Sequence, residues 1–253
     1  MNFIFFLGGH DAEMLEIREI LKQKEIPFYD KNLKWGAKLS DYKDEINNLS
    51  DNIQPVFIEL KPDISYPENS ILIDHHDSRA GKKQKTSLEQ TAELLNIKLN
   101  RHQQLISIND KAHIKGMKEF GASDDEIKKI RRLDRQAQGV TKKDEMYAER
   151  SIKENLEIIG SNAAIITTKS EKTSAVIDNI YDRFEHTIIL SPDGNSHYFG
   201  PGYMIDNFIK YLEILKKEEP DIEYWYGGTL PDSGFLGTTK TLTKEQLKKI
   251  LFN

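Results

Sequence analysis

Short apolar runs alternate with segments of helical period through the first third of the chain, and this pattern limits the folds open to it. The runs are residues 2–7 (NFIFFL), 26–30 (IPFYD), 55–60 (PVFIEL) and 70–76 (SILIDHH). Residues 12–25 place apolar side chains at the helical period, and 39–49 form a more polar helical segment. Continuous apolar strands separated by helices are typical of a parallel sheet covered on both faces. We therefore predict an α/β fold whose first domain covers residues 1–118.

The pattern restarts after a long charged stretch. We predict connecting helices over residues 119–160 and a smaller C-terminal α/β domain over 161–253, with a glycine-rich loop at 226–237 (YGGTLPDSGFLG). Three pairs of residues have the spacing of a helix-start capping box: Ser123 with Glu126, Thr141 with Asp144, and Thr243 with Gln246. The cluster KKIRR at 128–132 has the helical spacing of a solvated face.

Composition excludes several classes of function. The net charge is −5, which does not fit a protein that holds duplex DNA on a basic surface. Cysteine is absent, so thiolate metal sites, disulfides and cysteine nucleophiles are excluded and any metal must be held by His, Asp or Glu. The N-terminal apolar run is too short for a signal sequence or a membrane span. We expect a cytoplasmic protein with no membrane partner.

Ionisable residues follow three of the predicted strands. The triplet Asp74-His75-His76 ends the run at 70–76, Glu59 ends the run at 55–60, and the first run leads through Gly8-Gly9 into a polar segment. Ligands of parallel sheets collect beyond the carboxyl ends of the strands. We expect six residues, at strand ends or in adjoining loops, to face one crevice: Asp11, Glu13, Glu59, Asp74, His75 and Asp110.

Adjacent histidines at one strand end are more often structural than catalytic, and the surrounding acids change that interpretation. Converging carboxylates without a cation repel one another and raise their pKa values. A pair of divalent ions sharing a carboxylate removes the conflict and suits phosphoryl chemistry. The pattern therefore favours a metal site, with Mn²⁺ as the first choice and Mg²⁺ as the alternative.

The triplet at 74–76 after an apolar strand, followed by TSLEQTAELL at 86–95, resembles the DHH phosphoesterase superfamily. The resemblance in motif covers roughly residues 2–115, and the chain is similar to a divergent member. It implies that Asp11 and Glu13 match an Asp-x-Asp motif, Glu59 stands for the aspartate that bridges two metals, and Asp110 is the fourth motif. Leu7 occupies the position of the family's first histidine, and His10 could replace that imidazole.

The resemblance also implies roles in the reaction. It makes Asp11, Glu13, Glu59, His75, Asp110 and His10 the metal ligands. Asp74 would orient His75, and His76 would contact the phosphate or protonate the leaving oxygen, while hydroxide on the metal attacks. In the C-terminal domain, Gly227, Gly228 and His197 would bind the substrate.

Three functions follow from these expectations. The first is a hydrolase of a small phosphodiester, such as a short single-stranded oligonucleotide or a nucleotide-derived molecule. The second is a DHH-like nucleotide-binding module without catalysis, which the altered positions Leu7, Glu13 and Glu59 favour. The third is a phosphoanhydride hydrolase of the pyrophosphatase type, which normally grips its substrate with clustered basic residues that the C-terminal glycine loops lack. Oligomeric state is open.

Overall fold

The computed structural model describes residues 2–34, 36–76 and 84–252. The chain forms two compact units that meet in the sequence between Gly139 and Val140, and each is described by itself.

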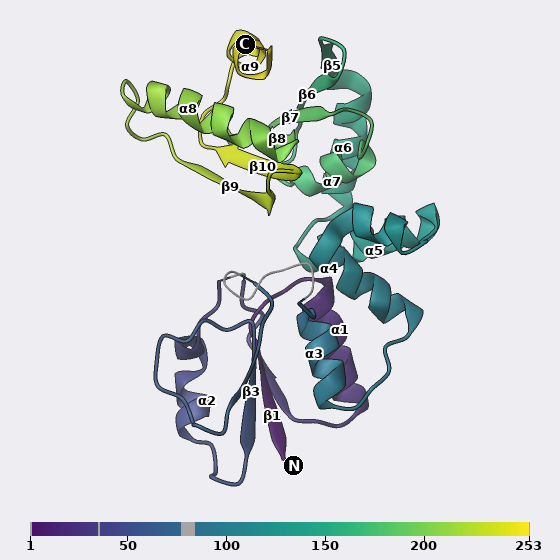
Figure 1. The fold of residues 1–253 in the computed structure, drawn as a ribbon, viewed down its shortest axis with the longest axis vertical. Helices are drawn as coiled ribbons and strands as arrows, with labels where there is room; N and C mark the ends of the chain where they lie inside the picture. The colour runs from purple at the N-terminus through teal and green to yellow at the C-terminus, as the bar shows by residue number, and fades with distance from the viewer. Residues whose placement is uncertain (1, 35, 77–83, 253) are drawn as a thin grey trace. The chain divides into compact units, whose positions relative to one another are not determined.

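The first unit contains a parallel sheet of four strands (Figure 1). Their order is β2-β1-β3-β4, and each neighbouring pair is parallel. The bounds are β1 Phe3–Leu7, β2 Phe28–Asp30, β3 Gln54–Ile58 and β4 Ile71–Ile73. The predicted parallel α/β sheet is thus confirmed, because runs that are apolar on both faces need cover on both.

Helices cover both faces of this sheet. In Figure 1, α1 and α3 lie on one side of β1 and β3, and α2 lies on the other. On the α2 side, Phe6 and Phe57 of the sheet pack against Leu39, Tyr42 and Ile46. The bounds are α1 Ala12–Gln23, η1 Leu39–Tyr42, α2 Lys43–Asn47, α3 Ser87–Leu94, α4 Arg101–Glu119 and α5 Asp124–Ala137.

The second unit contains a mixed six-stranded sheet in the order β5-β6-β7-β8-β10-β9. Of the strand pairs in the described part of this unit, only β6 and β7 are parallel. The strands are β5 Leu156–Ile159, β6 Ala163–Thr167, β7 His186–Leu190, β8 Ser196–Gly200, β9 Tyr224–Thr229 and β10 Ser233–Thr238. The helical segments are α6 Lys142–Asn155, α7 Thr173–Asn179, η3 Gly202–Met204, α8 Ile205–Lys216 and α9 Lys244–Phe252. Two apolar clusters form its core, one containing Phe208 of α8 and the other containing Ala148 of α6.

The strand that the sequence predicts at 222–228 (IEYWYGG) is present as β9, but the glycine-rich loop predicted to extend to 237 is wrong, because residues 233–238 form β10 and pair with β9 in an antiparallel hairpin. Gly227 pairs with Phe235, and Gly228 pairs with Gly234. A Cβ atom at Gly227 would lie 2.9 Å from the Phe235 ring, so the ring covers the space that a side chain would fill. Cross-strand packing therefore overrides the low strand propensity of glycine.

The predicted capping boxes are confirmed. Ser123 and Thr141 each accept a hydrogen bond from the backbone three residues on, and the acid there bonds back. Thr243 and Gln246 bond reciprocally in the same way. Within the segment predicted to connect the domains, α5 belongs to the first unit and α6 to the second, while 156–159 is strand.

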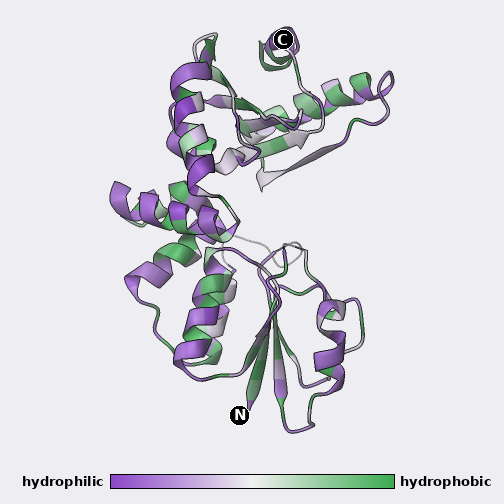
Figure 2. Ribbon diagram, turned by 180° about the vertical axis from the view of Figure 1, so that it is seen from behind, coloured by the Kyte–Doolittle hydropathy of each residue, from purple (hydrophilic) through white to green (hydrophobic). Residues whose placement is uncertain are grey.

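Hydropathy follows the layers of the fold. In Figure 2 the strands of the first unit are mostly hydrophobic, and the helices beside them carry hydrophilic residues over much of their length. In the part of the chain that the structure describes, no helix combines the length and the apolar composition needed to cross a membrane.

Candidate metal centre

His75 lies at the centre of an acidic cluster beyond the end of β4. Its Nε2 atom lies 2.7 Å from Asp110 Oδ2 and 3.3 Å from Glu13 Oε2. The same nitrogen lies 3.6 Å from Glu59 Oε1. His75 is buried, and so is Glu13, so these groups interact with little screening by water.

The acids reach this point from three different elements. Glu13 lies in the first turn of α1, and its Oε1 accepts a hydrogen bond from the Leu88 backbone N–H at the start of α3. Glu59 directly follows β3, and its Oε1 accepts from Ser87 Oγ over 2.8 Å. Asp110 comes from the middle of α4. Its expected place at a strand end or in an adjoining loop is therefore wrong.

Two backbone features bring Glu59 into the cluster. Its φ angle is +52°, a left-handed conformation that is uncommon for glutamate and that redirects the chain as β3 ends. The turn after β1 passes very close to it: a Cβ atom at Gly8 would lie 2.3 Å from the Glu59 carbonyl oxygen. A Cβ atom at Gly9 would lie 3.2 Å from Glu59 Oε2. Gly8 therefore permits the close approach of the Glu59 backbone, and Gly9 leaves room for the Glu59 carboxylate.

Three buried atoms of the cluster face one another without a hydrogen-bond partner: Glu13 Oε2, His75 Nε2 and Asp110 Oδ2. Buried polar atoms are nearly always satisfied, so three orphaned atoms in one place require an explanation. An octahedral ion with ligands at about 2.1 Å places adjacent ligand atoms about 3 Å apart. The separations of 2.7 Å and 3.3 Å from His75 Nε2 match that spacing. Nitrogen and carboxylate oxygen are also ligands that Mn²⁺ accepts.

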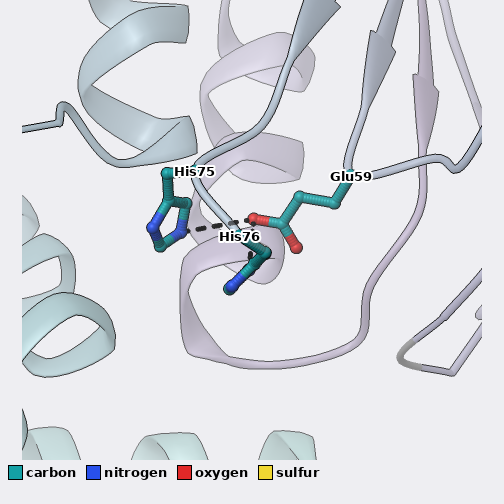
Figure 3. A group of neighbouring side chains, drawn as sticks. All are labelled: Glu59, His75 and His76. Atoms are coloured by element: carbon teal, nitrogen blue, oxygen red, sulfur yellow. Dashed lines mark ion pairs between the residues drawn. The ribbon is translucent and has the colours of Figure 1, made fainter. Parts of the chain in front are cut away.

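A second group lies beside the first and shares His75 with it. Figure 3 shows the Glu59 carboxylate directed toward His75 and His76. His76 Nε2 lies 3.4 Å from Glu59 Oε1, and the two imidazole rings are 4.1 Å apart. Over the described residues, the groups that could share an ion are Glu13-His75-Asp110 and Glu59-His75-His76.

The electrostatics of the cluster are those of acids gathered without a cation. Burial raises the pKa of Glu13 to about 7, with further increases from Asp110 and Glu59. Burial also raises the pKa of Asp11 well above its usual range, and Asp110 and Glu59 add to this effect. Each shift reflects the cost of ionising a buried carboxylate beside others.

The histidines respond in the opposite sense. Burial lowers the pKa of His75, but Asp110 and Glu13 outweigh it and raise the value to about 10. Glu59 raises the pKa of His76, whose side chain is 33% exposed. A positive charge is therefore favoured where His75 meets the acids, and a divalent ion would provide it.

Four other residues singled out in the first unit lie outside the two ligand groups, although Asp11 is close enough to Asp110 and Glu59 for them to raise its pKa. Asp11 caps α1, its Oδ1 accepting from the Met14 N–H over 2.8 Å. Asp74 Oδ1 accepts from the backbone N–H of His76, so it orders the turn that carries this histidine. His10 precedes the cap, and Leu7, at the end of β1, is fully buried. Among the described residues, the two ligand groups include none of these four.

The predicted substrate-binding residues lie in the second unit. Gly227 and Gly228 lie within β9. His197 lies on β8, with Nε2 3.1 Å from Ser191 Oγ and its ring edge-on to Trp225. Burial lowers the pKa of His197, so the neutral form is favoured.

Sequence reasoning missed two sets of supporting residues. The sequence shows Ser87 only as part of the motif at 86–95, whereas the structure places it in contact with Glu59, 28 positions away. The spacing of KKIRR predicts a solvated face for Arg131, but this side chain is buried. The pattern that could have identified Arg131 is its place directly after Ile130 and four residues after Ile127, on the apolar stripe of α5.

The fold and these side chains define an α/β protein with a candidate divalent-metal centre at the carboxyl end of a parallel sheet. No family model and no curated protein matches the sequence. Among solved structures, the chain is similar to RecJ of Thermus thermophilus in complex with Mn²⁺, with a TM-score of 0.39 and 9% identity over 92% of this chain and 49% of that one. The chain thus spans about half the length of that RecJ chain.

Two further solved structures are similar at the same level. One is an uncharacterized protein from Helicobacter pylori, with a TM-score of 0.30, 12% identity and 98% of each chain covered. The other is CDC45 from Entamoeba histolytica, with a TM-score of 0.34 and 8% identity over 98% of this chain and 94% of that one. Similarities at this level assign no function, which must be inferred from the side chains of the site.

Proposed function

We propose that the protein is a divalent-metal-dependent phosphoesterase, a divergent relative of the DHH superfamily that hydrolyses a small phosphodiester. One observation carries this proposal. Glu13 Oε2, His75 Nε2 and Asp110 Oδ2 are buried, face one another and lack hydrogen-bond partners. A bound cation would satisfy all three atoms at once, whereas their present arrangement gives none of them a well-aligned hydrogen bond.

The protein's own residues would hold the ion and orient the substrate. Glu13, His75 and Asp110 are the proposed ligands of one Mn²⁺ ion, with Mg²⁺ as the alternative. Glu59 lies beside them, between the two histidines, where a carboxylate could serve a second ion. When bound, the metal supplies an activated water and neutralises charge on the phosphate oxygens.

His76 is the proposed contact with the substrate's phosphate. It is the more exposed of the two histidines, and the raised pKa that Glu59 causes favours a protonated ring. A protonated imidazole can donate to a phosphate oxygen or to the departing oxygen. Asp74, by fixing the His76 backbone, would restrict where the ring can point.

Gly227, Gly228 and His197 remain the proposed substrate-binding residues of the second unit, for a short oligonucleotide or nucleotide-derived substrate. His197→Ala tests this assignment, because losing a substrate contact should raise KM and leave metal affinity unchanged. An unchanged KM would remove His197 from the site.

A nucleotide-binding module without catalysis is the second candidate. Leu7 favours it: this side chain is fully buried and takes the position at which the resemblance expects a metal-binding histidine. Tight binding of nucleotide, unaffected by removal of metal and without turnover, would support this candidate over the hydrolase.

The decisive experiment is hydrolysis of a panel with added Mn²⁺: an aryl phosphodiester, a linear dinucleotide, a cyclic dinucleotide and pyrophosphate. His75→Ala should lower turnover at least 100-fold, because it removes the proposed central ligand. His102→Ala is the matched control, since His102 lies at the start of α4 and belongs to neither ligand group among the described residues. Equal activity of wild type and His75→Ala would refute the proposal, and turnover of pyrophosphate alone would redirect it to phosphoanhydrides.

A further inference from the structure

A buried polar network joins α5 to the two helices that carry proposed metal ligands. Arg131 Nη1 on α5 donates to Asn109 Oδ1 on α4 over 2.9 Å and to Asp134 Oδ2 over 2.9 Å. Asp134 Oδ1 accepts from the backbone N–H of Ala12, the first residue of α1, over 3.3 Å. Arg131, Asp134 and Asn109 are all at least 93% buried.

Each end of this network lies next to a proposed ligand in the sequence. Ala12 stands between Asp11 and Glu13, and Asn109 immediately precedes Asp110. The network therefore connects the backbone that carries Glu13 to the helix turn that carries Asp110, across 97 positions of the chain from 13 to 110. To bind one metal ion, the two carboxylates must lie within about 3 Å of the same imidazole nitrogen. Small shifts of either helix would therefore weaken metal binding.

Stability alone does not account for burying an ion pair here. Desolvating two charges often costs as much as their attraction returns, and packed apolar residues of similar size do as well or better. Apolar residues of α5, including Ile127, Ile130 and Ala137, are buried as well, so the helix also has an apolar contact with the unit. What the polar pair adds is directional contact with two specific backbone positions, together with a negative charge at the N-terminus of α1.

We propose that Arg131 and Asp134 are positioning residues that set the spacing between Glu13 and Asp110 for metal binding. This inference rests on the proposed function, and it extends the site to residues that contact no substrate and no metal. It predicts that replacing the pair weakens metal binding more than it lowers the free energy of unfolding.

The test is a replacement of both charges together by apolar residues of similar size, Arg131→Met with Asp134→Leu. The dissociation constant for Mn²⁺, measured from the EPR signal of the free ion, should rise 10- to 100-fold, as loss of outer contacts to metal ligands typically causes. The variant should still unfold cooperatively. A neutral polar pair, Arg131→Gln with Asp134→Asn, keeps an acceptor for the Ala12 N–H and should recover most of the affinity.

Two controls separate positioning from general loosening of the fold. Ile130→Ala creates a cavity on the same helix without removing a hydrogen bond of the network, so it should lower stability and leave the Mn²⁺ affinity within twofold. Arg101→Gln removes the exposed ion pair with Glu126, a contact that joins α4 to α5 away from Asp110, and should also leave affinity unchanged.

The outcomes distinguish failure of the positioning role from failure of the proposed function. A folded apolar pair with wild-type affinity would overturn the positioning role while leaving the phosphoesterase proposal intact. Equal losses of affinity in Ile130→Ala and in the apolar pair would also overturn it, since general destabilisation would then be sufficient. A wild-type protein that binds no Mn²⁺ would overturn both proposals.

Discussion

The Nε2 atom of His75 lies 2.7 Å from Asp110 Oδ2, yet neither atom has a hydrogen-bond partner within the described structure. Atoms at this separation that are not aligned for a hydrogen bond are arranged as two ligands of a common ion would be. This contact joins the end of β4 to the middle of α4.

Glu13→Gln should stabilise the metal-free protein while weakening metal binding. The buried carboxylate has a pKa of about 7, so ionising it opposes folding at higher pH, and the neutral amide removes that cost. Its oxygen can still accept from the Leu88 N–H. We expect a gain of roughly 1–3 kcal/mol in the free energy of unfolding at pH 8, from about 1.4 kcal/mol per unit of pKa. Urea unfolding in EDTA measures it, and a loss of stability would show that the carboxylate is not strained.

The stability of the metal-free protein should fall as pH rises from about 4.5 to 10. Glu13 has a raised pKa, so its contribution is fully present below its unfolded value of 4.5 and is lost as pH rises through about 7. The contribution of His75, also raised, is fully present below 6.5 and is lost as pH rises through about 10.

Mn²⁺ should oppose this loss, because it binds the deprotonated ligands of the folded state. At 100 times its dissociation constant, it adds about 2.7 kcal/mol to the free energy of unfolding. Chemical denaturation at pH 5, 7 and 9, with EDTA or Mn²⁺, tests both effects. Metal-free stability that is flat over this range would contradict the proposed electrostatics.

Ser87→Ala should weaken Mn²⁺ binding about 10-fold, since Ser87 Oγ is the donor that holds Glu59 Oε1. The loss of one hydrogen bond should also lower stability by about 1 kcal/mol. Ser40→Ala is a suitable control, because Ser40 makes a comparable bond to Asp63 at an exposed position. Mn²⁺ titration compares the two variants, and similar affinities would show that Ser87 does not support the site.

Gly8→Ala should destabilise the first unit much more than Gly9→Ala. The new Cβ at Gly8 would lie 2.3 Å from the Glu59 carbonyl oxygen, so the backbone must shift. At Gly9 it would lie 3.2 Å from a carboxylate oxygen, which can give way by a small rotation. We expect a loss of roughly 2–4 kcal/mol for the first variant and less than about 1.5 kcal/mol for the second. Thermal unfolding in EDTA measures both, and equal losses would contradict the close approach.

The hydrophobic pattern of the sequence predicts the position of several residues that make contacts in the site. Continuous apolar runs predicted β1, β3 and β4, and the ends of β3 and β4 correctly placed Glu59 and His75 close together. Periodicity could not place Asp110, because its approach depends on how α4 packs across the end of the sheet. It also could not show that Leu7 is core, that Asp74 bonds to its own turn or that Glu59 has a positive φ.

The pattern of apolar and polar residues is a local property of the sequence. It was sufficient to predict the α/β class, the parallel sheet and the capped helices, because each of these depends on residues only a few positions apart. Tertiary packing decided which acids meet His75, that Arg131 is buried and that residues 233–238 form a strand. Those outcomes depend on contacts between distant segments, such as Ala12 with Asp134 and Gly227 with Phe235, whose free energies no local pattern contains.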